Sequence, residues 1–185
     1  TGGLDTYGET VSGGENGGGG GGGSTGTTGN DVITGTEGND SLTGLDGDDS
    51  MDALGGDDTL DGGQGADTLL GGDGNDLFEI RTSDVVLGES IDGGAGTDTI
   101  KVISNVADFR NADVTNVEVL EVTGNNEAQV YGDIFHNTSS TIKGESGTSQ
   151  HVVAWGTTGA DNYDFSTLQF DTWDVNEDRF EFRGE

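Results

Sequence analysis

Residues 26–79 read GTTGNDVIT, GTEGNDSLT, GLDGDDSMD, ALGGDDTLD, GGQGADTLL and GGDGNDLFE, which is one nine-residue pattern repeated without a gap. Every block has glycine at its fourth place, aspartate at its sixth and a large apolar residue at its eighth. Such a fixed period is typical of stacked repeats. The fourth-place glycines are Gly29, Gly38, Gly47, Gly56, Gly65 and Gly74. The sixth-place aspartates are Asp31, Asp40, Asp49, Asp58, Asp67 and Asp76.

Each block predicts half a coil of an all-β solenoid. Its glycine-rich start favours a tight turn, and its polar–apolar–polar end is a minimal strand with one inward side chain. Eighteen residues then close one coil, so residues 26–79 form three coils. Aspartates from alternate blocks share an edge, with Asp31, Asp49 and Asp67 on one edge. Carboxylates about 4.8 Å apart repel one another unless cations lie between successive turns of that edge, which we call its rungs.

The ligand chemistry favours calcium. The turns offer carboxylate and backbone carbonyl oxygens, and the chain has no Cys. Oxygen ligands without sulfur or imidazole suit a hard cation, and magnesium demands a tighter octahedral geometry. The blocks also carry too few apolar side chains to fold by burial alone.

The charge excludes several classes of partner. The chain has 36 acidic and 6 basic residues, a formal charge of −30, and every base lies beyond residue 80. Nucleic acids and anionic membrane surfaces are themselves negative, so we expect neither as a partner. No apolar run is long enough for membrane insertion.

These blocks resemble the RTX (repeats-in-toxin, haemolysin-type) calcium-binding nonapeptide, GGxGxDxUx, where U is large and apolar. Two further copies follow at 93–101, which includes Asp98, and at 156–164. The resemblance implies a right-handed parallel β-roll with calcium between successive turns of one edge. Asp98 and the fourth-place glycines of the turns are further candidate metal-site residues. The complete carboxylate pairs, which imply about four ions, are Asp31–Asp49, Asp40–Asp58, Asp49–Asp67 and Asp58–Asp76.

The blocks also depart from the consensus. Leu45 and Leu54 stand where the second glycine belongs, and Ala53 stands where the first belongs. Because these residues disfavour positive φ, we expect the sites around Ala53–Asp58 to be distorted or weak, and the terminal half-coils, which lack a neighbour, to be weak as well.

Three segments are predicted. Residues 1–25, with seven glycines at 17–23, are a flexible linker. Residues 26–101 are the roll, with an excursion at 80–92. Residues 102–185 are a β-rich extension with degenerate repeats that caps the open end of the roll.

The inventory of reactive residues does not predict an enzyme. Neither His136 nor His151 stands in a metalloprotease or nucleophile-elbow motif. The resemblance instead implies a calcium-binding module of a secreted bacterial protein, of adhesin, surface-layer or matrix type, that folds outside the cell after type I secretion. Its partners are then calcium, the rest of a larger parent chain and a surface or matrix component. The alternative is the accessory and export module of an extracellular protease, lipase or alginate epimerase.

Overall fold

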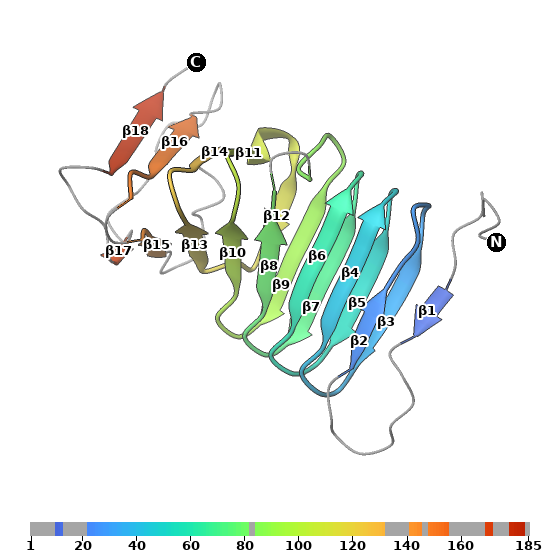
Figure 1. Cartoon of the computed structure of the whole chain (residues 1–185). Helices are drawn as coiled ribbons and strands as arrows, with labels where there is room; N and C mark the ends of the chain where they lie inside the picture. Colours follow the sequence, from blue (N-terminus) through green and yellow to red (C-terminus); the bar gives the residue numbers. More distant parts are fainter. Residues whose placement is uncertain are drawn as a thin grey trace.

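A computed structural model describes residues 10–12, 22–81, 84–131, 141–145, 148–155, 169–171 and 178–183. Within this part the chain is nearly all β, with parallel strands stacked into a solenoid of about 6 turns (Figure 1). The all-β parallel β-roll expected from the period is confirmed. A 3-10 helix, η1 (Phe109–Asn111), interrupts the strands.

Two parallel sheets form the walls of the roll. Sheet A has the order β1-β3-β5-β7-β9-β12, and sheet B has the order β17-β15-β13-β10-β8-β6-β4-β2. The strands of sheet A are β1 (Thr10–Ser12), β3 (Val32–Thr36), β5 (Ser50–Leu54), β7 (Thr68–Asp73), β9 (Ser90–Ala95) and β12 (Asp113–Thr115). Those of sheet B are β2 (Gly23–Thr25), β4 (Ser41–Asp46), β6 (Thr59–Gln64), β8 (Leu77–Ile80), β10 (Thr99–Val102), β13 (Val119–Val122), β15 (Thr141–Lys143) and β17 (Gln169–Asp171).

The register shows that two blocks make one coil. Ile33 lies opposite Met51 in sheet A, and Leu42 lies opposite Leu60 in sheet B, each pair being one coil apart. Each strand therefore repeats the position of the strand eighteen residues earlier, until the excursion after β8 lengthens one coil.

The core between the two sheets is built mainly on a file of eighth-place side chains. All of them are buried, and a second inward position two residues further along the strand adds Ala53, Ile80 and Val102 to the core. This file consists of Ile33, Leu42, Met51, Leu60, Leu69, Phe78, Ile91 and Ile100. So narrow a core leaves much of the cohesion to the turns at the two edges.

Beyond residue 102 the solenoid changes shape. Sheet A ends at β12, sheet B continues, and a third parallel sheet, sheet C, begins. Its strands are β11 (Val106–Asp108), β14 (Glu127–Tyr131), β16 (His151–Trp155) and β18 (Arg179–Arg183). The further copy of the repeat expected at 156–164 lies outside the described residues.

The first coil begins before the expected boundary at residue 25. β1 pairs with β3, and β2 pairs with β4, so residues of the expected linker already belong to the two sheets. The glycines that precede β2 are, except for Gly22, outside the described residues.

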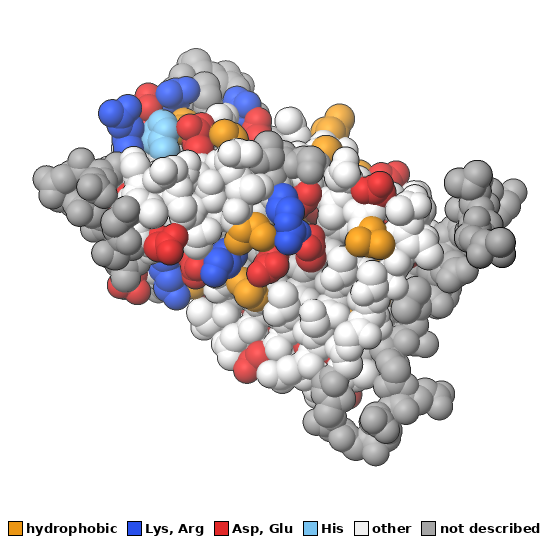
Figure 2. Space-filling view, in the orientation of Figure 1, with side chains coloured by type: hydrophobic (Ala, Val, Ile, Leu, Met, Phe, Trp, Pro, Cys, Tyr) orange, Lys and Arg blue, Asp and Glu red, His pale blue; other side chains and the backbone are white. Residues whose placement is uncertain are grey.

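Charge is distributed unevenly along the stack. Figure 2 shows the basic side chains on the C-terminal half of the molecule, in agreement with their positions beyond residue 80. In sheet B, Lys101 lies in register between Glu79 and Glu121, and Lys143 lies between Glu121 and Asp171. In this charge ladder, residues 79, 101, 121, 143 and 171, each base lies between two acids, so three acids and two bases leave a net charge of only −1. No helix of the described part is long and apolar enough to cross a membrane.

Candidate metal centre

The sixth-place aspartates form two buried columns, one along each edge of the roll. On the first edge, the peptide nitrogen of Asp31 donates to Oδ1 of Asp49 (2.8 Å), and that of Asp49 donates to Oδ1 of Asp67 (2.8 Å). On the second edge, the same hydrogen bond joins Asp40 to Asp58 (2.7 Å) and Asp58 to Asp76 (2.9 Å). Each carboxylate is therefore fixed by the backbone of the rung before it.

The second carboxylate oxygen has no hydrogen-bond partner on most rungs. This oxygen, Oδ2, is buried and unpartnered in Asp49, Asp58, Asp67, Asp76 and Asp98. A buried carboxylate oxygen without a donor is costly unless a cation neutralises it. These five oxygens are thus the strongest structural indication of cation sites.

On the first rung of each edge, by contrast, Oδ2 has hydrogen-bond partners. Oδ2 of Asp31 accepts hydrogen bonds from the peptide nitrogen of Thr27 and from its hydroxyl group (3.1 Å). Oδ2 of Asp40 accepts the equivalent bonds from Thr36 (3.0 Å for the hydroxyl). A second-place threonine therefore satisfies its own sixth-place carboxylate without a metal. Leucine and glycine at the second place of later blocks provide no hydroxyl.

The carboxylates are electrostatically frustrated without a cation. Four of them have a pKa raised to about 6, mainly by burial and also by neighbouring acids, although the peptide hydrogen bond lowers it; these four are Asp49, Asp58, Asp67 and Asp76. Burial also raises the pKa of Asp98. Since one pKa unit corresponds to about 1.4 kcal/mol between the two protonation states, the charged columns oppose the fold.

Backbone carbonyls approach the free carboxylate oxygens. A Cβ atom on Gly44 would clash both with Oδ2 of Asp49 and with the carbonyl oxygen of Gly62. A Cβ on Gly71 would meet Oδ2 of Asp76 and the carbonyl of Gly93 in the same way. Glycine at the first place thus lets a carboxylate of one rung approach a carbonyl of the next. Both are oxygen donors of the type that calcium prefers.

The fourth-place glycines stack on one another. A Cβ on Gly47 or Gly56 would clash with the backbone of Gly29 or Gly38, and one on Gly65 or Gly74 would clash with the next pair, Gly47 and Gly56. The structure therefore brings these candidate residues together at the two edges. No three His, Cys, Asp or Glu side chains of the described residues could hold an ion by themselves, so a cation here needs backbone carbonyls as well.

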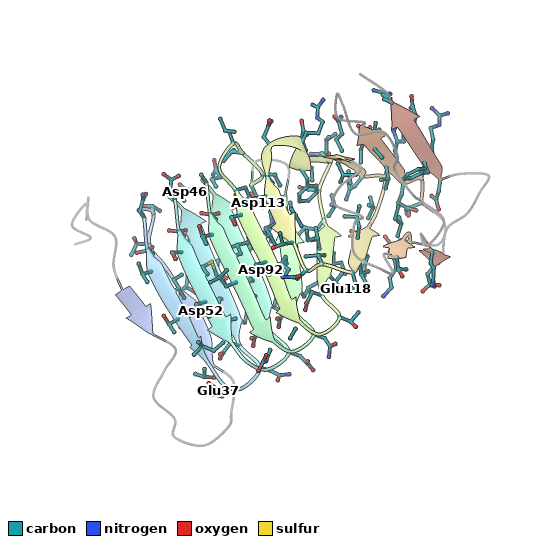
Figure 3. The ribbon with its side chains drawn as sticks, turned by 180° about the vertical axis from the view of Figure 1, so that it is seen from behind. Glu37, Asp46, Asp52, Asp92, Asp113 and Glu118 are labelled. Carbon is teal, nitrogen blue, oxygen red and sulfur yellow. The ribbon has the colours of Figure 1, made fainter. Side chains whose placement is uncertain are left out.

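Acids at other places of the blocks make different contacts. Figure 3 shows Asp46 and Glu37 at opposite edges and Asp52 on the face of sheet A. Oδ1 of Asp48 accepts from the peptide nitrogen of Ala66 (2.9 Å), and Oδ1 of Asp57 accepts from that of Asn75 (2.8 Å). The fifth place therefore forms an exposed hydrogen-bond ladder beside the buried columns.

Two glutamates continue the columns and were missed by the nine-residue pattern. The peptide nitrogen of Asp67 donates to Oε2 of Glu89 (3.1 Å), and that of Asp98 donates to Oε2 of Glu118 (2.9 Å). Asp98 itself accepts from the peptide nitrogen of Asp76 (2.8 Å). The sequence held a signal for Glu89, because it directly precedes the polar–apolar–polar triplet Ser90–Asp92.

Comparison with known families agrees with this geometry. The family model of the RTX calcium-binding nonapeptide repeat matches this sequence at residues 25–60, 43–78 and 89–101. A search of curated proteins finds no matching relative. The period, the buried carboxylate columns and the family match lead to one conclusion: the roll over residues 25–78 and 89–101 consists of RTX calcium-binding nonapeptide repeats.

Proposed function

We propose that this chain is a calcium-folded module of a secreted bacterial protein, in which calcium bound at the sixth-place aspartates joins one coil to the next. The observation that carries the proposal is the set of buried, unpartnered Oδ2 atoms on successive rungs. RTX repeats bind calcium, and they occur in secreted bacterial proteins.

The ligands in this proposal are the two aspartate columns, with Asp98 and the carbonyls of the glycine-rich turns. Asp49 and Asp58 each take part in two sites, one with the rung before and one with the rung after. The chain contributes oriented oxygens, held by peptide hydrogen bonds, and calcium supplies the positive charge that residues 26–79 lack. The roll acts through folding and has no catalytic role of its own.

The proposed setting is extracellular. With 14 acids and no base in residues 26–79, the roll stays expanded at low intracellular calcium and folds where calcium is millimolar. That coupling suits export of an unfolded chain by a type I system. A stack that cations stiffen suits a spacer in an adhesin, surface-layer or matrix protein.

Calcium titration of the full chain tests the proposal. Circular dichroism should show gain of β structure at about 10⁻⁴–10⁻³ M calcium, and magnesium at equal concentration should substitute poorly. Isothermal titration calorimetry should give several ions per chain. A strong β signal in excess chelator that calcium leaves unchanged would refute calcium-driven folding.

A further inference from the structure

The excursion after β8 leaves the first edge with an unusual rung. Successive carboxylates of this edge are 18 residues apart up to Asp67, but the next one, Glu89, is 22 residues further along. The strand register between β7 and β9 is nevertheless the regular one, because Ser90 lies opposite Thr68 and Ile91 lies opposite Leu69. Glu89 therefore occupies the place of a sixth-place aspartate in a turn that is four residues longer.

The position of Glu89 reproduces the peptide hydrogen bond that joins the regular rungs. Its Oε2 accepts the peptide hydrogen bond of Asp67, as Oδ1 of Asp67 accepts that of Asp49. Gly88, at φ +105, turns the chain directly before it and packs close to Ala66. The longer turn is thus compatible with a carboxylate that lies against the previous rung.

The surroundings of Glu89 are acidic and buried. Asp67 is 1% exposed, Glu89 is 2% exposed and the nearby Asp84 is 5% exposed. Oδ2 of Asp67 is buried and has no hydrogen-bond partner. No basic side chain of the described residues forms an ion pair with Asp67 or Glu89; Arg81, the base nearest in sequence, pairs with Asp61 and Glu79.

We propose that Asp67 and Glu89 bind a calcium ion between them, at a site beyond the last uninterrupted block. The inference rests on the proposed function and extends it, since the aspartate pairs of residues 26–79 do not include this site. Calcium at this site would bind the long turn to the rung of Asp67. The ion would thereby join β9, which directly follows Glu89, to the regular part of the roll.

Counting ions on Glu89→Gln tests the site. Glutamine keeps an oxygen that can accept the peptide hydrogen bond of Asp67 but removes the negative charge. Native mass spectrometry and calorimetry of the full chain at saturating calcium should find one ion fewer than in the wild type. The matched control is Glu37→Gln, which removes an exposed charge from the opposite edge (Figure 3) and should keep the full count.

The outcomes separate this site from the module's function. A wild-type chain that folds with calcium, together with a full ion count in Glu89→Gln, would overturn the site and leave the function standing. A wild-type chain that binds no calcium would overturn both. If Glu89→Gln does not regain the β signal, Glu89→Asp decides: a full count with one ion bound severalfold more weakly supports the site, and a titration identical to the wild type overturns it.

Discussion

The peptide nitrogen of Asp49 donates a 2.8 Å hydrogen bond to Oδ1 of Asp67, while Oδ2 of Asp67 is buried without any hydrogen-bond partner. One oxygen of the carboxylate therefore positions the side chain, and the other remains available. This division of roles recurs on both edges of the roll, at Asp49, Asp58 and Asp76.

The first prediction tests that division of roles. Asp49→Ala removes the free oxygen and leaves the buried peptide nitrogen of Asp31 without its acceptor. Hydrogen bonds to charged groups contribute about 1.5–3 kcal/mol, so the calcium midpoint should rise at least about tenfold. Calcium titration followed by circular dichroism at fixed ionic strength measures it.

The control for this experiment is Asp46→Ala. Asp46 is exposed, and its Oδ1 accepts a hydrogen bond from Nε2 of Gln64 (2.9 Å). The calcium midpoint of Asp46→Ala should therefore stay within about twofold of the wild type. Asp31→Ala should have an intermediate effect, because Thr27 already satisfies Oδ2 of Asp31 and the rung is terminal. Equal midpoints for Asp49→Ala and Asp46→Ala would show that the sixth place is not special.

The second prediction concerns pH. The folded-state pKa of about 6 for Asp67 and its equivalents lies above the ordinary aspartate value of about 3.9. Protonation therefore stabilises the metal-free fold below about pH 4, and this stabilisation is lost as the pH rises through 6. In chelator, the β signal should be larger at pH 5 than at pH 7.

With calcium present the direction reverses. Protons compete with calcium for the same oxygens, so the calcium midpoint should rise as the pH falls below about 6. Sedimentation velocity at each pH is the control, since lower net charge also promotes association. Loss of β signal on acidification in chelator, with the chain still monomeric, would contradict the assigned direction.

The regular part of the site follows from sequence because its contacts are local in the repeat. Each carboxylate meets the rung eighteen residues away, so one period predicts both columns. The terminal rungs do not follow from the period. Whether Oδ2 is free depends on the second place of the same block, where Thr27 and Thr36 donate to it. For that place the nine-residue pattern predicts a backbone conformation and no hydrogen bond to the carboxylate.

The sequence predicts an excursion and a β-rich extension, but it does not predict the glutamates that continue the columns or the third sheet, for a different reason. A turn of altered length breaks the nine-residue phase, and glutamate then takes the role of aspartate at Glu89 and Glu118. In sheet C the residues directly before the strands are mostly uncharged: Asn105, Asn126, Gln150 and Asp178. A third edge without a column of acids was not apparent from the repeat.

The third prediction concerns backbone strain. Leu54 has φ 73 and Leu45 has φ 89, in the region that favours glycine. The left-handed conformation costs an L-residue about 1–2 kcal/mol, and glycine costs about 0.5–1 kcal/mol in chain entropy. Leu54 is 38% exposed, so Leu54→Gly should lose little packing and gain about 0.5–1 kcal/mol in the free energy of unfolding.

Urea unfolding in saturating calcium checks this gain. The reverse change at the same place of a later block, Gly63→Leu, is the matched comparison. A Cβ on Gly63 would clash with the carbonyl oxygen of Leu45, so this variant should be clearly destabilised. If Leu54→Gly is less stable than the wild type, positive φ is not a source of strain at that turn.

The last prediction concerns the charge ladder of sheet B. Nζ of Lys101 lies 2.8 Å from Oε1 of Glu121, and Lys101 also lies in register with Glu79 on the strand before. Lys101→Glu would place a third acid between two others, whereas Lys101→Gln removes only the attraction. Like charges directly opposite destabilise a sheet, so Lys101→Glu should lower the free energy of unfolding by about 1–2 kcal/mol and Lys101→Gln by at most about 1 kcal/mol.

Because the Debye length falls to about 3 Å at 1 M salt, the difference in stability between the two variants should shrink there if it is electrostatic. Urea unfolding in saturating calcium at 0.1 M and 1 M sodium chloride measures it, and equal stabilities of the two variants at low salt would show that the C-terminal rungs do not depend on the ladder.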